Sequence, residues 1–169
     1  LKLDNFRYYV IQDALYLQDF ADCLRRLSKN EGVSPQDSQR LEQFAIGAEE
    51  AELSLHHSFF KQWQIDADGA EQMPNTLLYT SYMKRIVATR THAEGLAVLL
   101  PCFWVYMHVG DVLLTLRQKL GDSVQRLPQY DAWIDMYGGE DFAHEVKHYI
   151  ELVNVACASA DPVTLERMQ

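Results

Sequence analysis

The sequence predicts an all-α fold, and three observations support this prediction. Apolar residues recur every three or four positions through most of the chain, which is the spacing that gives a helix one buried face. No segment alternates apolar and polar residues for long, as a half-buried strand does. Clusters of Pro, Gly, Ser and Asp separate the periodic segments and carry helix start and stop signals. We therefore expect a bundle of long, mostly antiparallel helices.

The first two helices are predicted within residues 1–63. The first runs over residues 4–29 and ends at "NEGVS", where the apolar periodicity breaks. The second starts at a signal resembling a capping box, with Ser34 as the cap, Pro35 at the first helical position and Asp37 in the first turn. We expect it to continue unbroken to about residue 63, before the polar loop "DADGAEQMP". The residues expected to face inward are Leu41, Phe44, Ala48, Leu55 and Phe59.

Five further helices are predicted after that loop. Their expected ranges are 75–90, 92–120, 128–137, 140–158 and a short helix that begins after Asp161, its N-cap, with Pro162 at its first position. The 92–120 helix contains Pro101, which removes a backbone hydrogen bond and bends the helix. Its apolar run, "GLAVLLPCFWVYMHVG", is shorter than the 18 or more residues that a membrane span needs. We therefore expect a buried core helix.

Length and composition narrow the class of protein. The 169 residues are enough for one domain with a continuous core. The net charge of -9, from 15 Lys and Arg against 24 Asp and Glu with no basic block, argues against binding to nucleic acid or to an anionic membrane. Cys23, Cys102 and Cys157 show no CxxC spacing, which favours a reducing, cytoplasmic setting over a disulfide framework or zinc knuckle. Both ends resemble cut ends, so we expect further helices before Leu1 and after Gln169.

Asp13 lies in the middle of an apolar stripe. It follows Tyr9 and Val10 and precedes Tyr16 and Leu17 at helical spacing, which places it on the buried face. A buried carboxylate requires hydrogen-bond partners. Two interpretations stay open at this point: a carboxylate bonded to a neighbouring helix, or one that binds a ligand.

Two Glu and His pairs raise the possibility of a metal site. Glu52 and His56 are four residues apart on the inward face, and Glu145 and His148 form an ExxH pair on a later helix. A di-metal site needs further inward carboxylates, for which Asp13 and Glu49 are the candidates. A core histidine bonded to its own glutamate is the favoured interpretation, because one pair supplies only two ligands.

Aromatic residues gather at inward positions of four predicted helices. The tyrosines are Tyr16, Tyr79, Tyr82, Tyr106 and Tyr137, and Phe103 and Trp104 accompany them. Buried tyrosine hydroxyls need partners, so this set indicates a pocket for a flat, polar ring. Cys102 follows Pro101 and lies one turn before Tyr106. Taken alone, a cysteine with apolar neighbours is more typical of an inert small hydrophobe than of a nucleophile.

Five stretches resemble, in order, the signature blocks of the TenA family, the thiaminase II or aminopyrimidine aminohydrolase group. They are "FRYYVIQDALYLQDFA", "EAELSLHHSF", "YTSYM", "LLPCFWVYMHVG" and "WIDMYGGEDF". The resemblance covers nearly the whole chain, so it implies one TenA-like helical domain over residues 1–169, incomplete at both termini. It also implies a heme-oxygenase-like bundle, usually a homotetramer, with no metal or other cofactor.

The implied activity belongs to thiamin salvage. Members of the family hydrolyse 4-amino-5-aminomethyl-2-methylpyrimidine to the 5-hydroxymethyl compound and ammonia, and many also cleave thiamin. By motif position, Cys102 resembles the family's nucleophile and Asp13 the acid that binds the aminopyrimidine. The residues that resemble its pocket tyrosines are Tyr16, Tyr79, Tyr106 and Tyr137.

The sequence departs from the family pattern at one point. The family places a glutamate on its last helix to protonate the leaving amine, and Glu166 is too early in the chain to match it. Two alternatives to the hydrolase therefore stay open. One is a di-metal oxidase on the same bundle that uses Glu52 and His56, and the other is a non-catalytic regulator that binds pyrimidine or thiamin.

Overall fold

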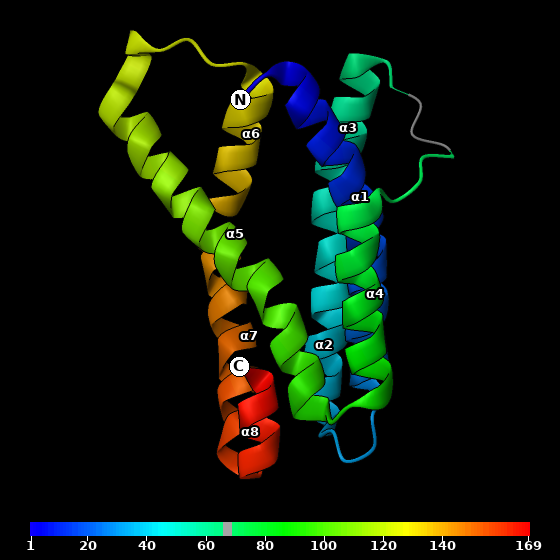
Figure 1. Ribbon diagram of the computed structural model, residues 1–169. Helices are drawn as coiled ribbons and strands as arrows, with labels where there is room; N and C mark the ends of the chain where they lie inside the picture. Colours follow the sequence, from blue (N-terminus) through cyan, green and yellow to red (C-terminus); the bar gives the residue numbers. More distant parts are fainter. Residues whose placement is uncertain (66–68) are drawn as a thin grey trace. The chain divides into compact units, whose positions relative to one another are not determined.

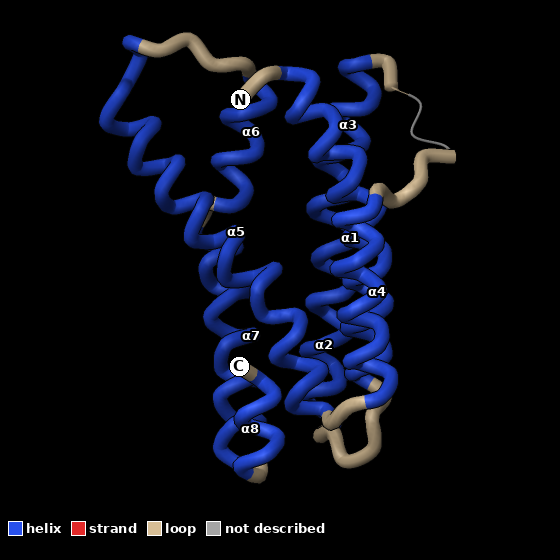
Figure 2. Tube along the Cα trace, viewed as in Figure 1, coloured by secondary structure: helices blue, strands red, loops and turns tan. Residues whose placement is uncertain are grey.

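The computed structural model describes residues 1–65 and 69–169, except for the side chains of Ala51, Glu52, Leu53 and Asp122. The described residues form helices, turns and loops without a strand (Figures 1 and 2), which confirms the predicted all-α class. The elements are α1 (Leu3–Ser28), α2 (Pro35–Gly47), the π-helical turn η1 (Ala48–Glu52), α3 (Leu53–Trp63), α4 (Pro74–Thr89), α5 (His92–Leu120), the 3-10 turn η2 (Gly121–Ser123), α6 (Pro128–Tyr137), α7 (Glu140–Ser159) and α8 (Pro162–Met168). Part of the predicted 66–74 loop lies outside the described residues.

The chain divides into two compact units, which we call unit 1 (Leu1–Gly95) and unit 2 (Leu96–Gln169). Helix α5 begins in unit 1 and continues through unit 2. Each unit has its own buried residues. The prediction of one TenA-like domain over residues 1–169 stays a prediction.

Unit 1 is built around α1, against which α2, η1, α3 and α4 pack. Burial of apolar surface on several sides of α1 drives this arrangement. Its buried apolar residues include Phe6, Val10, Leu17, Phe20, Leu24, Leu27, Leu41, Phe44, Met83 and Val87. A polar side chain on the same stripe of α1 is therefore also removed from water.

The predicted helix start at Ser34 is confirmed. The Ser34 hydroxyl accepts a hydrogen bond from the Asp37 backbone N–H at 3.1 Å. The start of α5 has a capping box that was not predicted from the sequence. The Thr91 N–H donates to the Glu94 carboxylate at 3.0 Å, and the Glu94 N–H donates to the Thr91 hydroxyl at 3.2 Å. This reciprocal pair sets where α5 begins.

The prediction of one unbroken helix over 34–63 was wrong, because the π-helical turn η1 separates α2 from α3. A π turn adds one residue to the helix and rotates everything after it. The predicted inward position Leu55 is accordingly only half-buried, while His56 is 1% exposed. Arg25 of α1 donates to both carboxylate oxygens of Glu49, each at 2.5 Å, and so fastens η1 to α1.

Unit 2 packs α6 and α7 against α5. The Phe103 and Tyr149 rings stack with centroids 4.2 Å apart, and the Tyr149 hydroxyl donates to the Leu96 carbonyl at 2.9 Å. Arg117 of α5 pairs with Asp131 of α6 at 3.2 Å. α8 folds back along the end of α7 (Figure 1), and its predicted cap is confirmed because Asp161 accepts from the Val163 N–H at 2.9 Å.

The prediction that the apolar run of α5 is too short for a membrane span was wrong. The apolar residues continue past Gly110, so α5 contains an 18-residue window with a mean hydropathy of 1.7 and meets the length and composition of a membrane span. Core helices of soluble proteins pass the same test, so this finding has little weight. The prediction of a buried helix holds for Leu96, Leu99 and Phe103. It fails for the exposed apolar residues, which are Trp104, Val105, Val109, Val112, Leu116 and Leu120.

Gly110 allows the backbones of α5 and α6 to touch. A Cβ at this position would collide with the carbonyl group of Tyr137 and would lie 2.6 Å from the Gly138 nitrogen. A Cβ added to Gly138 would in turn lie 2.9 Å from the Gly110 carbonyl oxygen. Two facing glycines therefore set the distance between α5 and the end of α6, and with it the position of Tyr137.

We predict that Gly110→Ala destabilises the protein by about 1–3 kcal/mol, because backbone atoms cannot yield as a flexible side chain does. Gly47 is the matched control, since a Cβ there meets nothing within 4 Å in a helical position. Gly47→Ala should be neutral or stabilising by up to about 1 kcal/mol. Urea unfolding measures both, and equal stability of the two variants would contradict the close approach.

Candidate active site

Asp13 is the centre of the polar group in unit 1. Its side chain is 3% exposed, which confirms the predicted burial. The Tyr9 hydroxyl donates to Asp13 Oδ2 at 3.0 Å, and His56 Nε2 lies 3.3 Å from the same oxygen. Tyr9 comes from one turn earlier on α1, whereas His56 comes from α3. The buried carboxylate thus has the donors that its burial requires.

His56 contacts Asp13 of α1, a carboxylate that was not predicted as its partner. The side chain of Glu52, its predicted partner, lies outside the described residues. His56 Nδ1 is buried and has no hydrogen-bond partner among the described residues. The "HH" of the stretch "EAELSLHHSF" was the sequence signal for His56. Helical spacing within that stretch could not show that His56 contacts α1.

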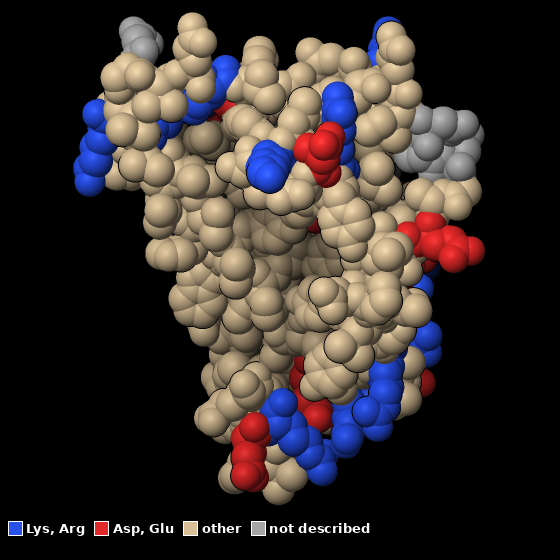
Figure 3. Space-filling model, turned by 45° about the horizontal axis from the view of Figure 1, so that its top comes forward, with Lys and Arg blue, Asp and Glu red and all other residues tan. Residues whose placement is uncertain are grey.

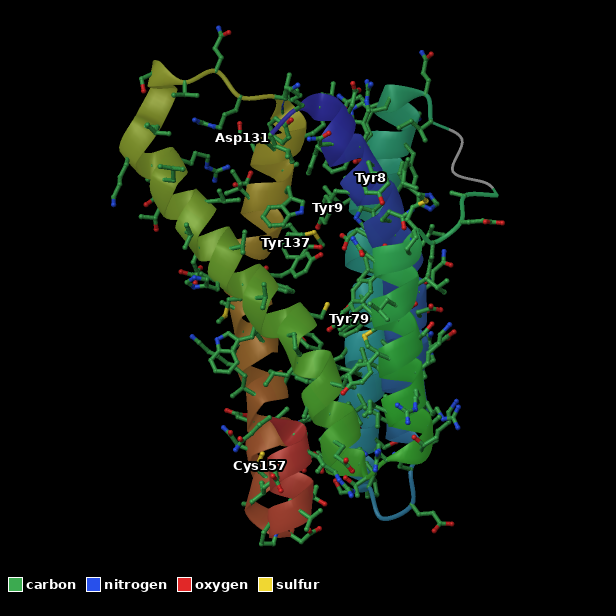
Figure 4. The ribbon with its side chains drawn as sticks, viewed as in Figure 1. Tyr8, Tyr9, Tyr79, Asp131, Tyr137 and Cys157 are labelled. Atoms are coloured by element: carbon green, nitrogen blue, oxygen red, sulfur yellow. The ribbon has the colours of Figure 1, made fainter. Side chains whose placement is uncertain are left out.

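An aromatic pair lies on the same helix as Asp13. The rings of Tyr16 from α1 and Tyr79 from α4 are parallel within 12°, with centroids 5.5 Å apart. Figure 4 labels Tyr79 on α4 and Tyr9 on α1. Tyr16 is buried and Tyr79 half-buried, as predicted, but Tyr82 is 51% exposed, so its predicted inward position was wrong. Tyr82 follows Tyr79 by three residues and lies far enough round α4 to leave the stripe.

Two glutamines fix the segment that leads into α4. Buried Gln12 donates to the Glu71 carbonyl at 3.1 Å and accepts from the Met73 N–H at 2.8 Å. Gln72 donates to Asp19 at 2.9 Å and accepts from the Thr80 hydroxyl at 2.6 Å. These bonds tie α4, and therefore Tyr79, to the stretch of α1 that carries Asp13 and Tyr16. Neither glutamine was predicted from the sequence, because nothing in their spacing marks them.

Unit 2 carries Cys102 and a separate aromatic cluster. Cys102 is half-buried on α5, and Tyr106 follows it by one turn. The Tyr106 and Tyr137 ring centroids are 4.9 Å apart. Trp133, which was not predicted from the sequence, lies 4.6 Å from Tyr137 and 6.2 Å from Tyr106. Trp104 is 53% exposed, so its predicted inward position was wrong.

The other two cysteines lie in different surroundings. Burial, with the nearby Asp19 carboxylate as a smaller cause, raises the pKa of the Cys23 thiol to about 11. That thiol stays protonated and unreactive near neutral pH. Cys157 lies at the opposite end of unit 2 from Asp131 (Figure 4). Cys102 is therefore the cysteine that shares a helix face with the aromatic cluster.

The described side chains do not assemble a di-metal site. Within them, no group of three or more His, Cys, Asp or Glu residues is arranged to hold a metal ion. His148, from the predicted ExxH pair, has its ring 4.1 Å from that of His144, while Glu145 is exposed. Asp13 and His56 are together but supply only two ligands. The di-metal alternative therefore lacks a ligand set in the described part of the chain.

Each unit thus offers one kind of chemistry. Unit 1 has a buried carboxylate that can accept N–H groups, beside stacked tyrosines that suit a flat ring. Unit 2 has a cysteine that can add to an electrophilic carbon.

The whole chain matches the model of the TENA/THI-4/PQQC family, over residues 1–169. The aminopyrimidine aminohydrolase of Bacillus subtilis (strain 168) is 35% identical over 153 residues, covering 89% of this chain and 61% of that protein. The thiamine biosynthesis multifunctional protein ThiED of Corynebacterium efficiens is 29% identical over 171 residues, covering 96% of this chain and 21% of that protein. The chain therefore spans less than two thirds of the length of either relative.

A solved structure gives the same fold. The crystal structure described as a TenA family transcription regulator from Silicibacter sp. TM1040 superposes with a TM-score of 0.84. The match covers 100% of this chain and 76% of that chain, at 20% sequence identity. Together with the family match over every residue, these comparisons assign the fold and the relationship: the chain belongs to the TENA/THI-4/PQQC family.

Proposed function

We propose that this protein is an aminopyrimidine aminohydrolase of the thiaminase II type, acting in thiamin salvage. The observation that carries the proposal is the 35% identity to the aminopyrimidine aminohydrolase of Bacillus subtilis over 89% of this chain. The proposed substrate is 4-amino-5-aminomethyl-2-methylpyrimidine, or thiamin, and water converts the aminomethyl group to hydroxymethyl with release of ammonia.

Asp13 and the tyrosines are the proposed ring-binding residues. The carboxylate of Asp13 accepts a hydrogen bond from the amino group attached to the ring. When a ring nitrogen is protonated, the carboxylate also accepts a hydrogen bond from that N–H group. The proposed pocket tyrosines, which would provide aromatic and hydroxyl contacts for the ring, are Tyr16, Tyr79, Tyr106 and Tyr137. Stacked, half-buried aromatic groups beside a buried acid support this assignment.

Cys102 is the proposed nucleophile. Its thiolate adds to a ring carbon of the electron-poor pyrimidine. The electron pair released into the dearomatised ring then expels the amine of the exocyclic methylene, which is already protonated as an ammonium group near neutral pH and so leaves as ammonia. Water then adds to the methylene and loses a proton, and the thiolate leaves as the ring regains aromaticity. No redox partner is needed, and the enzyme is returned unchanged.

The proposed assembly is a homotetramer in the cytoplasm, without nucleic acid or membrane partners. The exposed apolar stripe of α5, which contains Val105, Val109, Val112 and Leu116, supports a protein contact on this helix. The net charge of -9 weighs against nucleic acid. On the face that Figure 3 shows, basic side chains lie next to acidic ones.

One prediction of the proposed function concerns Cys102. Cys102→Ser should lower the rate of ammonia release from the aminomethylpyrimidine by more than about 100-fold, because a serine hydroxyl is a poor nucleophile without an activating base. Pyrimidine binding and the melting temperature should change little. Cys157→Ser is the matched control and should keep full turnover. Ammonia release by a coupled assay, together with calorimetric binding, measures all three proteins.

Two outcomes separate the alternatives. Undiminished turnover in Cys102→Ser would contradict the nucleophile assignment. Tight pyrimidine binding by the unmutated protein with no turnover would instead support a non-catalytic regulator.

Another prediction concerns the exposed apolar stripe of α5. Val112 is 50% exposed, and Val112→Glu should dissociate the tetramer, because an unpaired charge is costly in an apolar contact. Val155, which is 69% exposed on α7, is the control position, and Val155→Glu should leave the tetramer intact. Mass photometry reads the assembly state directly. A tetrameric Val112→Glu protein would place the contact elsewhere.

A further inference from the structure

Two histidines of α7 lie against each other in unit 2. His144 is exposed and His148 is half-buried, and they are four residues apart, so they lie one turn apart on one side of the helix. Their ring centroids are 4.1 Å apart, and the ring planes meet at 64°. The buried face of α7 lies on another side of the helix. Its residues are Val146, Tyr149, Leu152 and Val153.

The distance between the two rings is close to that of two imidazoles bound to one metal ion. With metal–nitrogen bonds of about 2.1 Å, the centroids of two such rings are about 4.5–5 Å apart. The observed distance of 4.1 Å is slightly shorter, and a small rotation of the exposed His144 side chain opens it. Because α7 already holds both residues one turn apart, metal binding would not have to order the backbone.

The charge along α7 favours a cation. Five exposed charged side chains lie on this helix. They are the carboxylates of Glu140, Asp141, Glu145 and Glu151 and the ammonium group of Lys147. Four negative charges against one positive charge raise the local concentration of cations. Among the described residues, no group of three His, Cys, Asp or Glu side chains could hold a metal ion, so an ion on the histidine pair would keep water at its other positions.

We propose that His144 and His148 form a surface site for a divalent transition-metal ion, with one ring nitrogen of each as ligand. Imidazole suits Cu²⁺, Ni²⁺ and Zn²⁺, whereas Mg²⁺ and Ca²⁺ require oxygen ligands. Structural zinc sites are closed by four protein ligands, so a site with two such ligands exchanges its ion with the solution. The inference is independent of the proposed function, because neither histidine belongs to the proposed pyrimidine site.

Calorimetric titration with NiCl₂ at about pH 7.5, where an ordinary imidazole is neutral, tests the proposal. Ni²⁺ binds imidazole and is not reduced by the thiols of the chain. His144→Gln and His148→Gln should each bind Ni²⁺ about 100-fold more weakly than the unmutated protein, because one bound imidazole holds the ion at a high effective concentration beside the other. Ni²⁺ affinity that neither variant changes would overturn the proposal.

His57→Gln is the matched control for these variants. His57 is also an exposed histidine on a helix, and none of the residues three or four positions away from it is a His, Cys, Asp or Glu. Its replacement should leave the Ni²⁺ affinity unchanged. A loss as large as that of His144→Gln would overturn the proposal, since it would show that any exposed histidine contributes equally. Circular dichroism should show the same helix content in all three variants.

A double variant tests whether the four-residue spacing makes the site. Glu140 is exposed and lies four residues before His144, so adding Glu140→His to His148→Gln restores the spacing one turn earlier in α7. The Ni²⁺ affinity should return to within about tenfold of that of the unmutated protein. A double variant that binds as weakly as His148→Gln alone would overturn this reading of the pair.

NMR of the unmutated protein provides a readout that needs no variant. Substoichiometric Ni²⁺ is paramagnetic and should broaden the ring signals of His144 and His148 before those of His57 and His108, which are both exposed. Mg²⁺ at the same concentration should leave all four signals unchanged, because it requires oxygen ligands. Broadening that begins at His57 or His108 would overturn the proposal.

Discussion

The burial of the Asp13 carboxylate is the constraint on which unit 1 depends. A charge removed from water inside a helical bundle survives only with donors, and those donors must come from elements held in fixed positions. Tyr9 and His56 supply them. The π-helical turn, the Arg25 to Glu49 hydrogen bonds and the inward rotation of α3 can all be understood as what brings His56 to that carboxylate. Asp13 is thereby held between α1 and α3.

Unit 2 meets a different constraint, which is the close approach of two backbones. Gly110 and Gly138 let α5 and α6 touch, and this contact brings the Tyr137 ring against Tyr106, one turn from Cys102. The Arg117 to Asp131 pair fastens the same two helices at a second point. The cysteine itself is half-buried, whereas burial, with Asp19 as a smaller cause, raises the pKa of the Cys23 thiol to about 11. The three thiols thus differ in their surroundings, and their local sequence does not distinguish them.

Periodicity predicted the helices well and predicted contacts between them poorly. Spacing and capping chemistry predicted the helix starts at Ser34 and Asp161 and the burial of Asp13. The π-helical turn did not, because one extra residue in a helix leaves no mark in the apolar pattern. The partners of His56, Gln12 and Gln72 were missed for a related reason: hydrogen bonds over 40 to 60 positions depend on packing, which spacing along one helix does not encode. The hydropathy of α5 is uniform along its length, so the sequence pattern did not indicate which side of this helix is exposed.

The chain belongs to the TENA/THI-4/PQQC family, and the function proposed for it depends on Cys102 as the nucleophile. The central claim of that proposal is that the Cys102 sulfur adds to a carbon of the pyrimidine ring. A crystal structure of the protein with 4-amino-5-aminomethyl-2-methylpyrimidine bound tests it most directly. We predict that the Cys102 sulfur faces a carbon of that ring. A ring bound away from Cys102 would contradict this claim.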